Sequence, residues 1–323
     1  MARALRSREM VLFALLAILF SVMSLRVDGF FDAYNLLERT RYWVGPGLIA
    51  IPMTFVIATG GIDLSVASIL ALCGIVMGLL YNDAHWPMAA AAGASLLTGL
   101  ACGAFNGGVA SWVGVPPLVV TLATMALFRG VAMGLSQAKA FSDFPGWFVW
   151  LGQGSVARVP FTAANPAYLP APLVLLAAAY ALGWFLMHRS WIGRFTEMTG
   201  ENETAARFAA IDVRRLKLAL YAGCGLMCGL AAIVHTALYA TAKADTASGM
   251  ELDVIACVVV GGTRISGGRA SIAGTLIGLT ILGLLRFGLE MAGVSAQYII
   301  IVVGLVLVVA AILNERLGRS AGG

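Results

Sequence analysis

The sequence predicts an all-α fold, a polytopic bundle of transmembrane helices, and three observations carry this prediction. Of the 323 residues, 60% are hydrophobic and only 11% are charged, whereas an ordinary soluble domain is about 25% charged. Apolar runs about 20 residues long, the length that crosses a bilayer, recur along the chain. One polar stretch, residues 188–217, interrupts them, and its charges have to lie in water or against another protein because charge is costly inside a bilayer.

Applying that length in chain order places about ten spans in a single transmembrane domain that covers residues 1–323. Their approximate ranges are 9–26, 43–59, 62–81, 88–112, 117–137, 170–187, 216–241, 252–266, 270–289 and 295–314. An even number of spans puts both termini on one side of the membrane. Placing the termini in the cytoplasm gives the inner loops most of the 21 Lys and Arg residues, as the positive-inside rule requires. We therefore expect cytoplasmic termini and a cytoplasmic 188–217 loop.

Glycines four residues apart predict helices that pack backbone to backbone. Gly99, Gly103 and Gly107 would form a groove on one helix face. The same spacing recurs at positions 74/78, 130/134, 225/229 and 274/278. These pairs indicate a closely packed bundle and give no information on a substrate.

The longest loop on the predicted outer side, residues 138–169, is rich in proline, glycine and aromatic residues. Tryptophan favours the membrane interface, so one interpretation is a partly ordered cap at that level. A plain connector is the other interpretation.

Two glycine-rich turns interrupt apolar runs on the predicted cytoplasmic side. The first holds Gly60, Gly61, Asp63 and Ser65, and the second holds Gly261, Gly262, Gly267 and Gly268. Asp63 or Ser65 can cap the helix that follows the first turn, where the helix dipole favours a carboxylate. Two interpretations stay open: a helix-capping turn, or a gate or contact with a cytoplasmic partner.

The second turn does not fit a phosphate-binding loop. Gly262 and Gly267 have the first spacing of such a loop, but Gly268 and Arg269 stand where Lys and Ser or Thr are needed. The chain also has no soluble α/β domain that could carry the loop. We therefore expect no ATP site and no cofactor in this chain.

Catalytic and metal chemistry are not indicated either. The five cysteines all lie in apolar runs and are interpreted as packing residues. His85, His188 and His235 lie in different segments without partner residues, so no catalytic or metal site is expected. Arg286 and Glu290 are four residues apart and can pair. A proton-driven carrier would show a buried series of carboxylates or histidines, which the sequence lacks.

The polar 188–217 loop predicts a short helix of its own. Asn202 can cap it, with Glu203 in its first turn, and alanines at 205, 206, 209 and 210 would let another protein approach closely. One interpretation is a docking surface; the other is a solvated amphipathic connector. The candidate docking residues are Glu201, Asn202, Glu203, Ala205, Ala206, Arg207 and Ala209.

Four stretches of the sequence resemble the permease subunits of bacterial sugar ATP-binding-cassette (ABC) importers. They are GGIDLSV (60–66), VPPLVVTLATMA (115–126), ELDVIA (251–256) and GGTRISGGRAS (261–271). The branch they resemble includes the ribose, xylose, arabinose, rhamnose and autoinducer-2 systems. RYWV (41–44) and WLGQG (150–154) are most similar to the rhamnose-type permeases.

This resemblance implies an inner-membrane permease that moves a monosaccharide and is not an enzyme. The implied partners are two cytoplasmic ATPase subunits, a periplasmic sugar-binding protein, a second permease subunit (identical or related) and membrane lipid, without nucleic acid. Residues 200–211 are similar to the family's coupling helix. The chain departs from the family at Ala67, Ala210 and Ala270, where glycine is frequent, and at Thr204. The alternative is a stand-alone secondary carrier or channel for a small polar solute.

Overall fold

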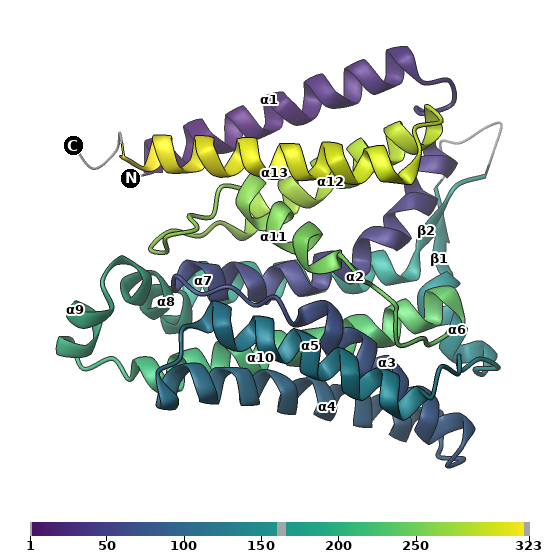
Figure 1. Cartoon of the computed structure of the whole chain (residues 1–323). Coiled ribbons are helices and arrows are strands. Elements are labelled where there is room, and N and C mark those ends of the chain that lie inside the picture. The colour runs from purple at the N-terminus through teal and green to yellow at the C-terminus, as the bar shows by residue number, and fades with distance from the viewer. Residues whose placement is uncertain (1, 160–165, 320–323) are drawn as a thin grey trace.

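The computed structural model describes residues 2–159 and 166–319, and helices dominate them (Figure 1). In chain order the elements are α1 (Ala2–Arg26), α2 (Ala33–Ala58), α3 (Val66–Asn82), α4 (Met88–Gly108), the π-helical turn η1 (Val109–Val113), α5 (Pro117–Ser136), α6 (Gly146–Gln153), β1 (Ser155–Arg158), β2 (Tyr168–Pro170), α7 (Ala171–Arg189), α8 (Trp191–Glu201), α9 (Glu203–Phe208), α10 (Val213–Tyr239), α11 (Met250–Val260), α12 (Ile272–Met291) and α13 (Ala296–Arg319). A helix lies at each of the ten predicted spans.

The helices differ in how far they can reach across a bilayer. Six within the described residues are long and apolar enough to cross: α2, α4 with η1, α5, α7, α10 and α12. Shorter apolar helices cover Met10–Arg26, Val66–Asn82 and Ala296–Ile312. The eleven residues of α11 rise about 16 Å, roughly half of a bilayer core of about 30 Å. The polytopic bundle is confirmed, whereas the number of ten spans stays a prediction.

Glycines bring α4 and α10 into backbone contact, as the sequence predicts. A Cβ added at Gly99 would lie 2.2 Å from the carbonyl oxygen of Gly225, and one at Gly103 would lie 2.1 Å from that of Tyr221. No larger residue fits such a contact without moving a helix. At Gly130 and Gly134 on α5 an added Cβ would meet no described atom within 4 Å, so that pair serves no packing in the described chain.

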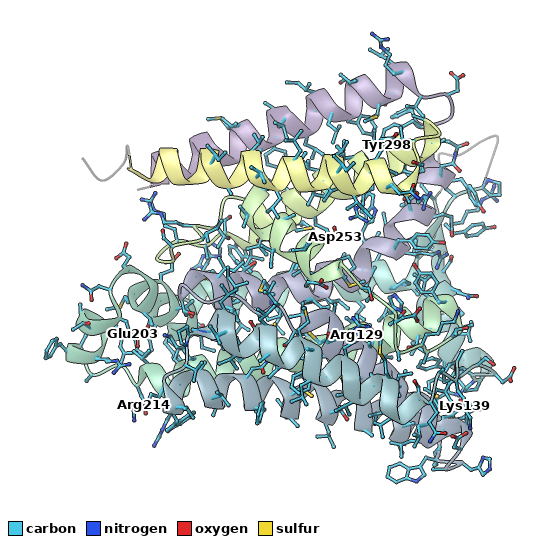
Figure 2. The ribbon with its side chains drawn as sticks, viewed as in Figure 1. Arg129, Lys139, Glu203, Arg214, Asp253 and Tyr298 are labelled. Carbon is cyan, nitrogen blue, oxygen red and sulfur yellow. The ribbon has the colours of Figure 1, made fainter. Side chains whose placement is uncertain are left out.

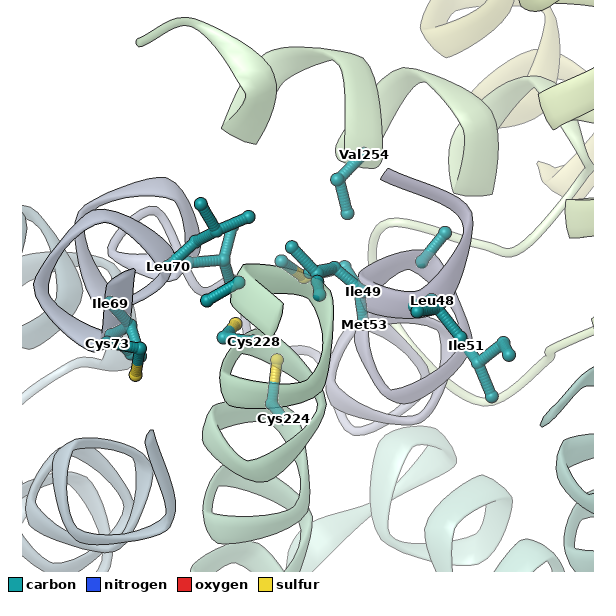
Figure 3. Close-up of a cluster of buried hydrophobic side chains, with 14 of the residues drawn as sticks. Leu48, Ile49, Ile51, Met53, Ile69, Leu70, Cys73, Cys224, Cys228 and Val254 are labelled. Carbon is teal, nitrogen blue, oxygen red and sulfur yellow. The ribbon is translucent and has the colours of Figure 1, made fainter. Parts of the chain in front are cut away.

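The apolar core lies where α2, α3, α10 and α11 meet (Figure 3). Leu48 and Met53 of α2 are fully buried there. Cys224 and Cys228 of α10 and Val254 of α11 complete this centre, each with no exposed surface. The predicted packing role of these two cysteines is therefore confirmed.

The described part of the 138–169 segment is ordered, which favours a cap over a plain connector. Helix α6 is followed by β1, which pairs antiparallel with β2 and forms a small exception to the all-α prediction. Arg41 on α2 fixes the cap, because its Nη1 donates to the carbonyl oxygens of Gly154 at 2.7 Å and Gly152 at 3.3 Å. Residues 160–165 lie outside the described residues.

Helix α1 begins, and α13 ends, at the end of the bundle that carries α8 and α9 (Figure 1). This arrangement agrees with the prediction that the chain termini lie on the same side as the polar 188–217 loop. The cap formed by α6, β1 and β2 lies at the opposite end. Helices α2, α7, α10 and α12 run between the two ends, and α7 leads directly from β2 of the cap to α8.

Candidate functional site

Both glycine-rich turns and the end of α8 meet at one place, which we name the glycine junction: residues 58–61, 200–201 and 266–270. The Gly268 N–H donates to the Ala58 carbonyl at 2.9 Å, which ties the second turn to the end of α2. A Cβ added at Gly200 would lie 1.8 Å from that same carbonyl oxygen and 2.4 Å from the Gly268 nitrogen. The sequence placed these segments on one side, and the structure brings their backbones into contact.

Two glycines of the second turn allow this approach through their backbone conformation. Gly267 and Gly268 have φ of +87° and +84°, a left-handed region that a residue with a Cβ rarely adopts. A Cβ at Gly267 would also lie 3.0 Å from the nitrogen of Gly60. The second turn therefore contacts the backbone of Gly60 and Gly200 only because residues 267 and 268 are both glycine.

Glu197 adds a side-chain link between α8 and the second turn. Its Oε1 accepts a hydrogen bond from the Ala270 N–H at 3.3 Å. Burial raises the pKa of the Glu197 carboxyl, and this effect outweighs the hydrogen bond from Ala270 and the charges of His188 and Arg269, which lower it. Residue types and spacing could not predict this link, because the partner of Glu197 is a backbone group.

Asp63 and Ser65, predicted cap or gate residues, are both fully buried. The Asp63 Oδ1 accepts from the Ser65 N–H at 2.9 Å and from the Ser65 hydroxyl at 2.6 Å. The Asn106 amide donates to the Ser65 Oγ at 2.8 Å and joins this turn to α4. Ser65 precedes α3 without capping it through its own side chain. This geometry favours a structural turn over direct contact with a cytoplasmic partner for these two side chains.

Helix α9 begins as the sequence predicts. The Asn202 Oδ1 accepts from the Ala205 N–H at 3.0 Å, and the Asp212 Oδ1 accepts from the Arg215 N–H at 3.1 Å at the start of α10. The predicted alanine face is divided, however. Ala206 is only 2% exposed because it packs with Ile211 and Val213, whereas Ala205, Ala209 and Ala210 are exposed.

An ion-pair cluster holds α9 against the start of α10. Glu203 accepts from Arg207 Nη2 and from Lys217 Nζ, each at 2.6 Å. Burial raises the pKa of Glu203, but the hydrogen bonds and charges of Lys217 and Arg207 together outweigh burial and hold the pKa below its ordinary value. Glu203 and Arg214 lie together at one end of the bundle in Figure 2, with Lys139 at the other end. These ion pairs thus fix the orientation of α9 relative to the start of α10.

Phe208, at the last position of α9, is a residue that the sequence reasoning missed. Its side chain is 89% exposed, the highest value among the exposed large hydrophobic residues. Phenylalanine is among the aromatic residues that are enriched in the buried cores of protein interfaces, so Phe208 is a candidate contact for a partner. A bulky apolar residue within an otherwise polar and alanine-rich helix was the signal that the sequence offered.

Charges at the other end of the bundle pair differently from the sequence prediction. Arg286 pairs with Asp253 of α11, and Glu290 pairs with Arg39 of α2. The predicted pair between Arg286 and Glu290 is therefore replaced by two pairs that each join α12 to another helix. Arg129 donates to two carbonyl oxygens after α10, at 2.7 and 2.8 Å.

Comparison with known proteins identifies the group of the chain. Residues 41–311 match the family described as branched-chain amino acid transport system / permease component. The autoinducer 2 import system permease protein of Photorhabdus luminescens is 35% identical over 97% of this chain and 91% of its own length. The ribose import permease protein of Escherichia coli K12 is 35% identical over 93% of this chain and 92% of its own. No solved structure matches.

These relatives align along nearly the whole chain, so the match includes the glycine junction and α9 as well as the membrane helices. They are named for autoinducer 2 and ribose, and they give the rhamnose-type resemblance no support. The chain belongs to the branched-chain amino acid transport system / permease component family, as an inner-membrane permease subunit, not an enzyme, in the branch of the ribose and autoinducer-2 ABC importers.

Proposed function

We propose that this permease moves a monosaccharide inward when a separate pair of ATPase subunits acts on α9. A periplasmic sugar-binding protein delivers the solute at the opposite end, and a second permease subunit, identical or related, completes the pathway. The observation that carries the proposal is the exposed Phe208 on a short helix that follows directly after the glycine junction. The names of the relatives support a ribose-like sugar over rhamnose.

The glycine junction explains how a displacement of α9 would reach the membrane helices. Gly200 lies one residue before the end of α8 and touches the backbone of both turns. The first turn continues α2, and the second joins α11 to α12. Because these segments touch backbone to backbone, without side chains between them, one segment cannot move far without displacing the others. Close-packed interiors transmit strain in this way. Movement of α8 and α9 therefore shifts the ends of three helices together.

Orientation follows from the same proposal. The ATPases are cytoplasmic, so α9, the start of α1 and the end of α13 face the cytoplasm, and the cap formed by α6, β1 and β2 faces the periplasm. The basic residues of the 188–217 loop fit that side by the positive-inside rule. The chain itself then needs no nucleotide or other cofactor.

The experiment replaces Phe208 by alanine in the complete transporter, reconstituted with its ATPase and binding protein. If Phe208 is an anchor, its loss should cost about 2 kcal/mol of docking free energy, roughly a thirtyfold loss of ATPase affinity. Sugar uptake and sugar-stimulated ATP hydrolysis should fall together. Phe185→Ala on α7, also an exposed phenylalanine at 54%, is the matched control.

Membrane insertion of both variants is measured by their yield in purified membranes, and we expect it to equal that of the unchanged chain. If the Phe208→Ala variant took up sugar as fast as the Phe185→Ala control, the proposed role of Phe208 in docking the ATPase would be refuted. Transport by the purified chain in liposomes without an ATPase would instead support the stand-alone carrier.

A further inference from the structure

A cavity of about 340 Å³ opens between α2, α10, α11 and α12. Asp253 in its lining lies well away from Glu203 of α9 in Figure 2. Ligand pockets in proteins run from about 300 to 1,000 Å³, so this one suits a small solute. At about 30 Å³ per water, it has room for roughly ten waters. Its lining combines charged, aromatic and apolar side chains, chiefly Arg39, Tyr42, Trp43, Asp253, Arg286 and Glu290.

The charged groups of the cavity balance one another. Arg39 pairs with Glu290, and Arg286 pairs with Asp253. The four side chains are between 24% and 42% exposed, so they keep contact with the space in the cavity. Each carboxylate has about four lone-pair sites and each guanidinium five N–H donors. The hydroxyl groups of a solute can bind the donors and acceptors that the two ion pairs leave unused, without breaking either pair. A singly charged ion would gain little, because each pair places an opposite charge beside the charge that attracts it.

Aromatic rings line the same space beside these donors and acceptors. The Arg39 guanidinium lies 5.5 Å from the ring centre of Tyr42 and 5.2 Å from that of Phe287, which holds it in place. Tyr42 and Tyr239 meet edge to face with their centres 6.1 Å apart. A Cβ at Gly283 would lie 2.4 Å from the Trp43 indole, so glycine makes room for that ring in the wall.

We propose that this cavity is a binding site for a neutral polyhydroxylated solute of monosaccharide size, recognised by the two ion pairs and the aromatic wall. Hydroxyl edges need donors and acceptors of both kinds, and the C–H face of a sugar ring needs a flat apolar surface. The cavity supplies both within one small volume. The inference rests on the proposed transport function and names the substrate class at one site.

The position of the cavity links it to the glycine junction. Cys257 lines the cavity, and its carbonyl oxygen accepts from the Gly261 N–H at 3.0 Å, at the start of the second turn. A Cβ at Gly278 of α12 would lie 2.2 Å from the same carbonyl oxygen. The short α11 thus has one end in the cavity wall and the other at the start of the second turn, whose later residues 266–270 belong to the junction. A shift at α9 would therefore alter the cavity wall.

Protection of an engineered cysteine tests the site directly. Met250 is half-buried in the cavity lining, and the five native cysteines are buried. In vesicles that carry the complete transporter, Met250→Cys is reacted with a small water-soluble maleimide, with D-ribose, L-rhamnose or L-leucine in large excess. We expect a sugar to slow alkylation severalfold and leucine to leave it unchanged. Lys139→Cys, on an exposed loop outside the cavity, is the control that no solute should protect.

Each outcome decides between the ideas. Protection by leucine and not by sugars would overturn the substrate class, because a zwitterion would then be exchanging with the ion pairs. Equal alkylation with every solute would overturn the site. The proposed function would survive that result if Phe208→Ala still lowered sugar uptake relative to Phe185→Ala.

A matched pair of glycine variants provides the transport readout. Gly283→Ala would place a methyl group against the Trp43 indole in the cavity wall and displace that ring, and we expect the KM for sugar uptake to rise about tenfold. Gly130→Ala makes the same substitution where an added Cβ meets no described atom within 4 Å, and uptake should stay unchanged. An unaltered KM in Gly283→Ala, with normal membrane yield, would count against the cavity as a sugar site.

Discussion

At the scale of single residues, the buried carboxyl of Glu197, which accepts from Ala270 of the junction, lowers the stability of the fold at neutral pH. The folded chain holds the proton of this carboxyl more tightly than the unfolded chain because its pKa is raised by burial. The penalty of the buried charge is therefore absent below the unfolded-state pKa and complete once the pH rises above the raised folded-state pKa. Neutral pH lies in the range where the penalty acts.

Glu197→Gln removes that penalty and keeps an oxygen for the Ala270 N–H. We expect the glutamine variant to unfold at a slightly higher temperature than the unchanged chain at about pH 7, with the gain vanishing near about pH 4. Glu197→Ala loses the acceptor and should be less stable by about 1 kcal/mol. Thermal unfolding in detergent at both pH values measures these effects. A gain that grew on acidification would contradict the assigned sign.

Gly200 is the residue whose size matters most at the junction. Gly200→Ala would place a methyl group 1.8 Å from the Ala58 carbonyl oxygen, and both neighbours are backbone. We expect the end of α8 to move and coupling to be lost, at a stability cost of about 1–3 kcal/mol. Basal ATP hydrolysis of the complex should continue without its stimulation by sugar. Gly223→Ala on α10, where an added Cβ meets no described atom within 4 Å, should keep normal stimulation.

At the scale of elements, the contact between α4 and α10 depends on glycine. Gly103→Ala would bring a methyl group within 2.1 Å of the Tyr221 carbonyl oxygen, and the two helices would have to separate. We expect a loss of about 1–3 kcal/mol, measured as a lower thermal midpoint in detergent. Gly134→Ala on α5 has no such neighbour in the described chain and should be neutral or slightly stabilising. Equal midpoints for the two variants would show that the groove is dispensable.

Helix caps and packing glycines could be read from the sequence because they obey local rules. Asn202 and Asp212 cap the helices that follow them, as their side chains predict. The predicted span 252–266 ran past the end of α11 at Val260, because the length rule for a bilayer span was applied across the glycine-rich turn. Burial of Ala206 was missed for another reason. It depends on Ile211 and Val213 folding back, which the alanine spacing does not encode.

The site was less predictable than the fold, since most of its contacts are non-local. Both glycine turns were candidates, yet their meeting with Gly200 needs three segments far apart in the chain. The charged cavity was not foreseen either. Arg286 had a local partner at a favourable spacing in Glu290, but each is taken by a residue of another helix. Spacing along one helix could not rank those alternatives.

At the scale of the whole molecule, the arrangement separates two tasks along one set of helices. One end carries the braced α9 and the glycine junction, and the other carries the cavity with its balanced charges. Helices α2 and α12 run past both, and α11 spans the interval between them. Coupling then requires no long side-chain relay, because a rigid helix displaced at one end moves at the other.

That interpretation requires the two ends to face opposite sides of the membrane. Arg214 lies with Glu203 at the α9 end, and Lys139 lies at the other end (Figure 2). Arg214→Cys and Lys139→Cys place one exposed cysteine at each. In intact cells whose outer membrane has been permeabilised, a membrane-impermeant maleimide should label Lys139→Cys and reach Arg214→Cys only after the inner membrane is opened. The reverse order would place α9 in the periplasm, out of reach of any ATPase, and would refute the proposed coupling together with the orientation.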